Sequence, residues 1–288
     1  MGGPTDVAVV NAALWHRFSK DRFGISGLLI IVIFAILSLC VWFGILGQGW
    51  AQTSGSYWAS ASMEHWFGTN RLGQDILDRT LVGAATALEV GFSVTLFSIL
   101  LGVVLGAISG WRSHSWLDEI ILWAMGVLDS IPFYLFAAAL AFAMRGQYFA
   151  MHLAMILTFW TTTARIIRAE VMRLKQREFV EAARAIGLPG MTIVFRHILP
   201  NTVHILLVQA TIIFVVAIKT EVILSFLGLG VSNGVSWGLM LAESSQEVLT
   251  GHFGNFLAAS LSLFALLMGF NLLTDALQDA FDNRGKIV

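Results

Sequence analysis

The chain has 288 residues, of which 57% are apolar and 12% charged, and its formal net charge is -1. Soluble domains carry about 25% charged residues, so this composition argues against a soluble fold and indicates that most of the chain is surrounded by lipid. The single cysteine, Cys40, excludes an internal disulfide and any metal site built from several thiolates.

The first apolar stretch, Ile25–Leu46, contains no charged residue. A bilayer core requires about 20 apolar residues in a helix, so residues 25–46 are predicted to form the first transmembrane helix. This stretch is too long for the apolar core of a typical signal peptide, and we expect an uncleaved anchor. Residues 1–24 form a cytoplasmic or interfacial segment, where apolar residues at helical spacing favour a short interfacial helix, although a frayed tail fits equally well.

Five further apolar windows each have the length of one membrane span. They are Leu88–Gly110, Ile120–Met144, Phe149–Ile166, Val203–Leu227 and Phe256–Leu277. The chain is therefore predicted to be an all-α integral membrane protein with about six transmembrane helices. Most Lys and Arg residues fall on the side that holds the N-terminus, so the positive-inside rule places both termini in the cytoplasm.

Two long segments, residues 47–87 and 228–255, are predicted on the outer side of the membrane, where their Trp residues suit the headgroup level. Residues 88–288 form a five-helix core that includes a cytoplasmic loop at residues 167–202. A large share of the Lys and Arg residues falls between Arg165 and Arg196. This concentration of positive charge indicates that the loop region is the working surface on the cytoplasmic side.

The loop at residues 167–202 is too polar for hydrocarbon and too rich in helix formers to be a simple linker. Ala, Glu, Arg, Leu and Met dominate up to Ile186, and Gly187 followed by Pro189 is typical of a helix end. A second short helix is predicted to run from there toward Pro200. The loop is therefore expected to fold as two helices.

One face of the first loop helix is predicted to dock on another protein. Phe179, Ala182, Ala183 and Ile186 recur at the spacing of a single helical face. The two alanines allow another surface to approach closely, and the two larger side chains can fill a groove. This pattern favours helix-in-groove recognition of a partner.

The order Glu181-Ala182-Ala183, then Gly187, then His197-Ile198-Leu199-Pro200 resembles the EAA loop of ATP-binding-cassette importer permeases. In that family the loop is a coupling helix that docks into a groove on the ATPase subunit. The resemblance and the predicted contact face together assign ATPase coupling to eight residues. They are Phe179, Glu181, Ala182, Ala183, Ile186, Gly187, His197 and Pro200.

The resemblance covers most of the chain from His65 onward and narrows the family to the dipeptide, oligopeptide and nickel permeases. The matching segments are His65–Arg79, Asp129–Pro132, Leu224–Gly230 with Glu221, Ser236–Glu243 and Asn271–Asp275. The chain is similar to the second, C-type permease of such importers. It departs from the pattern in a short outer loop around Arg145 and in Lys219 within the fifth span, and both departures leave the substrate open.

The resemblance implies a type I importer permease fold in the cytoplasmic membrane and a role in ATP-driven uptake of dipeptides or oligopeptides. Nickel or another small solute is the alternative cargo. The implied partners are a homologous permease, two ATPase subunits or domains, an extracytoplasmic binding protein and membrane lipid, with no nucleic acid. The sequence has no Gly-rich P-loop, so the chain is expected to be no enzyme and to bind no cofactor, with ATP and Mg²⁺ held by the ATPases.

Three charged residues within predicted spans, Asp129, Lys219 and Glu221, are candidates for the translocation path, because such residues are costly in lipid. Lys219 and Glu221 are two residues apart and cannot pair along one helix. Other roles fit as well: Lys219 can snorkel outward, and Asp129 can cap a kink at Pro132 or bond to the partner permease. A rival hypothesis makes the three a relay in an ATP-independent transporter or channel.

The sequence shows no recognisable site for bond chemistry or for a metal. The histidines His152, His197 and His204 do not follow the spacing of a ligand set, so no metal site is predicted. No Gly-x-Ser-x-Gly elbow is present, and no nucleophile pairs with a base at a recognisable spacing. An intramembrane hydrolase is therefore disfavoured.

Overall fold

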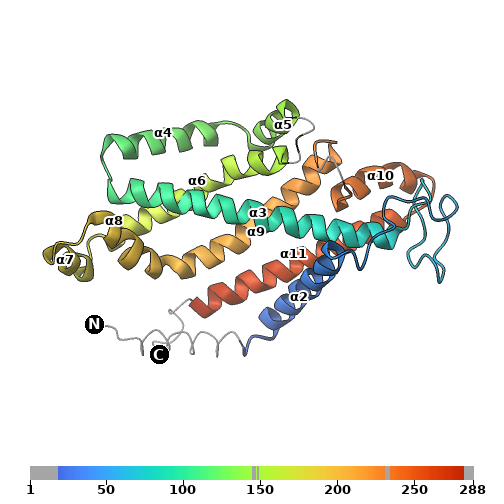
Figure 1. Ribbon diagram of the computed structural model, residues 1–288, viewed down its shortest axis with the longest axis horizontal. Coiled ribbons are helices and arrows are strands. Elements are labelled where there is room, and N and C mark those ends of the chain that lie inside the picture. The colour runs from blue at the N-terminus through green and yellow to red at the C-terminus, as the bar shows by residue number, and fades with distance from the viewer. Residues whose placement is uncertain (1–18, 145–146, 148, 231–233, 282–288) are drawn as a thin grey trace. The chain divides into compact units, whose positions relative to one another are not determined.

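The computed structural model describes residues 19–144, 147, 149–230 and 234–281 (Figure 1). Within these residues all regular secondary structure is helical, apart from isolated bridges such as Thr53–Gln74. The all-α prediction is confirmed. Most of the predicted interfacial segment, and Arg145 in the short outer loop, lie outside the described residues. The chain divides into two compact units, residues 1–91 with 218–288 and residues 92–217.

The helices are long, and most of them are apolar. Their bounds are α2 Arg22–Trp42, α3 Ile76–Trp111, α4 Trp116–Ser130, α5 Phe133–Ala143, α6 Ala150–Leu174, α7 Glu178–Ala185, α8 Gly190–Ile193, α9 Val203–Phe226, α10 Trp237–Leu249 and α11 Gly254–Phe281. Among the described residues five helical segments are long and apolar enough to cross a membrane, and the bent pair α4–α5 raises the number to six. The number of spans agrees with the prediction.

In the first unit α2 packs along α11, side by side in Figure 1. The two backbones come close at Gly27 and Gly269, since a Cβ atom on Gly27 would lie 2.6 Å from the carbonyl oxygen of Gly269. Small residues at a crossing let membrane helices approach and gain dispersion contacts. Helix α10 also packs against α11. This unit therefore has an apolar helix pair with a shorter helix attached.

The first unit contains helix within the two segments, residues 47–87 and 228–255, that were predicted to lie outside the spans. Helix α3 begins at Ile76, earlier than the predicted span at Leu88, and α10 occupies the segment at residues 228–255. Arg79 in the early turns of α3 is buried and donates a 2.6 Å bond to Glu243 of α10. A tertiary ion pair thus allows a charged helical turn that hydropathy alone does not reveal.

In the second unit α3 crosses α6 through three glycines spaced four residues apart, Gly102, Gly106 and Gly110. A Cβ atom on Gly106 would lie 2.4 Å from the carbonyl oxygen of Ala164, and one on Gly110 would lie 2.7 Å from that of Arg168. Only glycine fits at such distances. This small-residue stripe positions α6 and therefore the segment that follows it.

The third predicted span, Ile120–Met144, is two helices. Helix α4 ends at Ser130, α5 begins at Phe133, and the two are bent by 91°. Pro132 between them cannot donate a backbone hydrogen bond. The carbonyl of Leu128, whose usual helical donor would be the residue at position 132, accepts instead from the backbone N–H of Ile131 at 3.3 Å. The predicted kink is therefore a break in the helix.

Candidate functional site

The candidate coupling segment is α7, which follows α6 after the short connection Lys175–Arg177 and contacts α8 (Figure 1). Gly187 ends it with a φ of +81°. The N–H of Gly187 donates to the carbonyl of Arg184 at 2.9 Å, and the N–H of Leu188 donates to that of Ala183 at 3.1 Å. These two bonds form a Schellman motif, so the predicted stop at Gly187 is confirmed.

The inner face of α7 is anchored in the core of its own unit. Val180 is 0% exposed and Ala183 is 5% exposed. They pack in one cluster with apolar residues of α3, α6, α8 and the turns that follow it. The cluster contains Ala107, Ile167, Val171, Leu174, Ile193, Val194, Ile198 and Leu199. This cluster holds α7 at a fixed position relative to the membrane-spanning helix α6.

The predicted four-residue contact face needs a correction, because Ala183 belongs to this inner face and not to the exposed one. The other three residues are on the surface: Phe179 is 40% exposed, Ile186 is 77% exposed, and Ala182 is exposed as well. They follow the spacing i, i+3 and i+7. Since large apolar side chains on a polar loop favour burial, this outer face is the surface of α7 suited to a partner.

Trp111 at the end of α3 supports α7 from the side. The Arg184 guanidinium lies 4.9 Å from its ring, and the Lys175 ammonium lies 5.4 Å from it. Lys175 Nζ also donates to the Trp111 carbonyl at 2.6 Å. Burial and the nearby Arg184 charge lower the pKa of Lys175 below its usual value. The sequence reasoning missed Trp111, because nothing in the local pattern connects it to a loop more than sixty residues away.

His197 and Pro200 lie in the continuous helical segment after α8, which consists of a π-helical turn Val194–Ile198 and a 3-10 turn Leu199–Thr202 leading into α9. His197 is half-buried and Pro200 is exposed. The amide of Asn201 donates to the His197 carbonyl at 2.6 Å. The predicted second helix therefore exists, but it continues into the next span without a stop.

Two acid–arginine pairs connect α4 with α6. Asp118 accepts two bonds of 2.9 Å from Arg168 and one of 2.5 Å from the hydroxyl of Ser109. Asp129 accepts bonds of 2.5 Å from Arg165 and 3.1 Å from the hydroxyl of Thr161. The sequence placed Arg165 at the start of the cytoplasmic working surface, but α6 continues about two and a half turns beyond it.

Residues 102–286 match the family described as the binding-protein-dependent transport system inner membrane component. The chain belongs to this family. It is 32% identical to the dipeptide transport system permease protein DppC of Bacillus subtilis, over 93% of this chain and 84% of the relative. It is also 32% identical to the oligopeptide permease protein OppC of the same organism, over 98% and 93% respectively.

A third relative is the glutathione transport system permease protein GsiD of Pectobacterium atrosepticum, which is 33% identical over 94% of this chain and 90% of its own length. Together with the family match, these relatives establish the chain as a multi-pass permease component of the inner membrane. The resemblance inferred from the EAA order and its flanking segments is thereby confirmed.

Lys219 and Glu221, the other charged residues predicted within a span of this permease, lie in the last turns of α9. Glu221 is 1% exposed and accepts a 2.5 Å bond from the hydroxyl of Ser225. Lys219 is exposed, and no ion pair joins it to Glu221 in the described part of the chain. The two side chains point to different surroundings, which agrees with their spacing on the helix.

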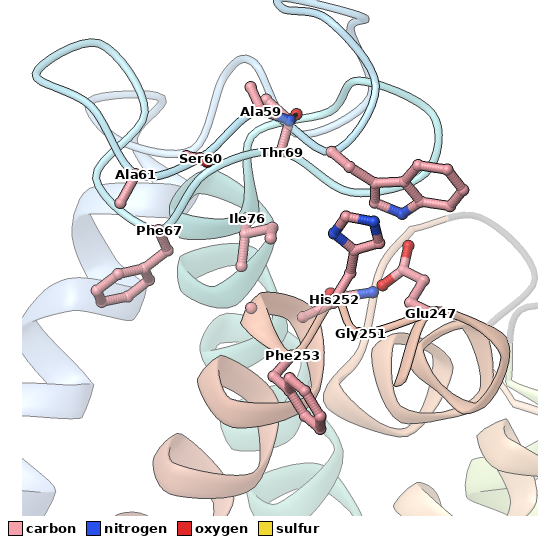
Figure 2. A pocket seen from close by; sticks show the side chains of 13 residues that line it. Ala59, Ser60, Ala61, Phe67, Thr69, Ile76, Glu247, Gly251, His252 and Phe253 are labelled. Carbon is pink, nitrogen blue, oxygen red and sulfur yellow. Dashed lines mark hydrogen bonds between the residues drawn. The ribbon is translucent and has the colours of Figure 1, made fainter. Parts of the chain in front are cut away.

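The permease also has a pocket of about 270 Å³ in its first unit, between residues 58–76 and the connection from α10 to α11. Figure 2 shows His252, Glu247, Phe67 and Phe253 around it. The ring of His252 stacks on that of Trp58 with centroids 4.6 Å apart. Glu247 accepts a 2.8 Å bond from the backbone N–H of Arg71. These contacts hold the long outer segment against the ends of two helices.

Proposed function

We propose that this permease moves peptides across the cytoplasmic membrane, forms the path with a homologous permease, and is driven by two separate ATPase subunits or domains. The family description and the names of the dipeptide, oligopeptide and glutathione relatives support a binding-protein-dependent peptide importer. ATP and Mg²⁺ are then bound by the ATPases, and an extracytoplasmic binding protein delivers the peptide. The permease itself carries out no bond chemistry.

The observation that carries the coupling proposal is the two-sided construction of α7. Its inner residues Val180 and Ala183 are fixed in the core of the unit, and its outer residues Phe179, Ala182 and Ile186 are exposed. A docked ATPase would bury the outer face and push on a helix that cannot move independently of α6. Closure of the ATPases on ATP would thereby be transmitted to the spans.

Arginine on the outer face tests this proposal. Ala182→Arg places a long charged side chain where a groove is expected to approach closely, so it should abolish ATPase co-purification and ATP-dependent peptide uptake while the permease itself still folds. The matched control is Ala182→Ser, which keeps a small uncharged side chain at the same exposed position. Both are measured by pull-down of the ATPases and by uptake into proteoliposomes.

Normal ATPase binding and uptake by the Ala182→Arg complex would contradict coupling through this face. Equal loss with Ala182→Ser would instead indicate that any change at this position disturbs α7. Ala183→Arg is unsuitable as a test, because it would bury a charge in the apolar cluster and unfold the segment for reasons unrelated to docking.

A further inference from the structure

The two ion pairs between α4 and α6 differ sharply in exposure. The Asp118 and Arg168 side chains are 2% and 21% exposed, whereas those of Asp129 and Arg165 are 39% and 64% exposed. A charged side chain within a membrane span is stable only when it is paired inside protein or faces water or a ligand. Asp118 and Arg168 meet this condition, because they are paired inside the protein. Asp129 and Arg165 are paired but exposed, so their charges require water or a ligand as a further neighbour.

The exposed pair lines a cavity of about 620 Å³, a size within the range of about 300–1,000 Å³ for small-molecule sites. One wall is the break between α4 and α5, including Pro132, and the other is formed by Thr158, Thr162 and Arg165 of α6. Secondary transporters build many of their solute sites beside broken helices, where backbone groups and helix ends are available to a ligand. The cavity therefore combines opposite charges, hydroxyl groups and a helix break.

Asp129 and Arg165 can give up the ion pair between them and bind the charged groups of a ligand instead. Exposed ion pairs contribute little to stability, because water screens both charges. The planar guanidinium of Arg165 can bind a carboxylate with two parallel hydrogen bonds. Asp129 is also held by the hydroxyl of Thr161, so it keeps a hydrogen bond when Arg165 turns away. Opening the pair leaves a cationic and an anionic group next to each other in one cavity.

We propose that this cavity binds the charged ends of a zwitterionic solute, with Arg165 taking the carboxylate and Asp129 taking the ammonium group. The inference rests on the proposed peptide function, because a free peptide carries both groups. It adds Arg165 to the candidate residues of the translocation path and assigns the binding of an ammonium group to Asp129. Neither residue takes part in chemistry; both recognise charge.

The test measures protection of a cysteine in the assembled complex. Cys40 is the single native cysteine, so Cys40→Ala gives a cysteine-free background in which Thr162→Cys labels the exposed cavity wall. Its rate of modification by uncharged methyl methanethiosulfonate is followed with alanyl-alanine, with its C-terminal amide, and without addition. Protection is read as the ratio of the rates with and without addition in each variant, because removing a nearby charge also changes the thiolate fraction of the cysteine.

We expect alanyl-alanine to slow the modification several-fold and the amide to leave it nearly unchanged. Arg165→Met should remove the protection, because the carboxylate then has no cation. Arg173→Met is the matched control: it removes another exposed arginine of α6 that forms an ion pair, with Glu170, outside the cavity. Protection should survive in that variant.

The proposal is overturned if the dipeptide and its amide protect equally, if protection survives Arg165→Met, or if neither compound protects. Failure of the proposed function is read separately, from ATP-dependent uptake of alanyl-alanine by the unmodified complex with its binding protein. A complex that takes up the dipeptide without protection of the cavity is a peptide importer whose recognition site lies elsewhere.

Discussion

Single residues decide where α7 ends and which of its side chains face outward. Gly187 adopts a left-handed backbone conformation, and no atom lies near enough to meet an added Cβ. The requirement at this position is therefore conformational and not one of space. The correction at Ala183 also concerns a single residue. The spacing of four residues on one helix does not show which of them packs against the protein's own core.

Gly187→Ala should loosen the end of α7, since a left-handed conformation costs a residue with a Cβ about 1–2 kcal/mol. Faster hydrogen exchange is expected at the backbone amides of Gly187's neighbours Ile186 and Leu188, measured by mass spectrometry on the purified complex. Gly187→Asn is the control and should recover part of the protection, because asparagine tolerates this conformation. Equal exchange in all three proteins would show that the Schellman bonds do not hold the helix end.

Asp118→Asn should destabilise the permease by about 3 kcal/mol, because removing one partner of a buried ion pair leaves an uncompensated charge. The measurement is thermal unfolding of the detergent-solubilised chain, followed by tryptophan fluorescence. Asp129→Asn changes the same chemical group in the exposed pair and should cost less than about 1 kcal/mol. If both variants lose the same stability, the distinction between a structural and a ligand-binding pair is wrong.

At the scale of elements, the crossing of α3 and α6 determines where α7 begins. The three glycines of α3 bring the backbones of these helices together, and the end of α6 then carries α7 on a three-residue connection. Trp111 at the end of α3 braces the same segment through Lys175 and Arg184. Movement of α7 would therefore be passed to two spans at once.

Gly106→Val tests this crossing. Overpacking a tight contact costs about 1–3 kcal/mol. The variant should therefore unfold at a lower temperature than the unmodified permease and take up less peptide. Gly126→Val is the control, since a Cβ atom there meets nothing within 4 Å. The two are compared by thermal unfolding and by uptake in proteoliposomes. A Gly106→Val protein as stable as the control would mean that the crossing relaxes without loss.

At the scale of the whole molecule, the chain is a membrane protein with a short amphipathic helix, α7, between two of its spans and with charged groups inside the spans. The family match and the relatives assign the permease role, and the structure adds the distinction between anchored and available surfaces. Val180 and Ala183 tie α7 to the spans, and Phe179, Ala182 and Ile186 remain for a partner. This division is what a mechanical joint requires, because a contact face that moved freely could transmit no force.

The sequence by itself determined the membrane class, the number of spans, the end of α7 at Gly187 and the family, because hydropathy and motif spacing are local properties. Tertiary structure alone decided that Ala183 faces inward, that Trp111 supports α7, that Arg165 pairs with Asp129, and that α3 extends back to Ile76 with Arg79 buried in it. Each of these depends on a contact between residues distant in the chain. Burial and ion pairing are set by such neighbours, and no local pattern contains them.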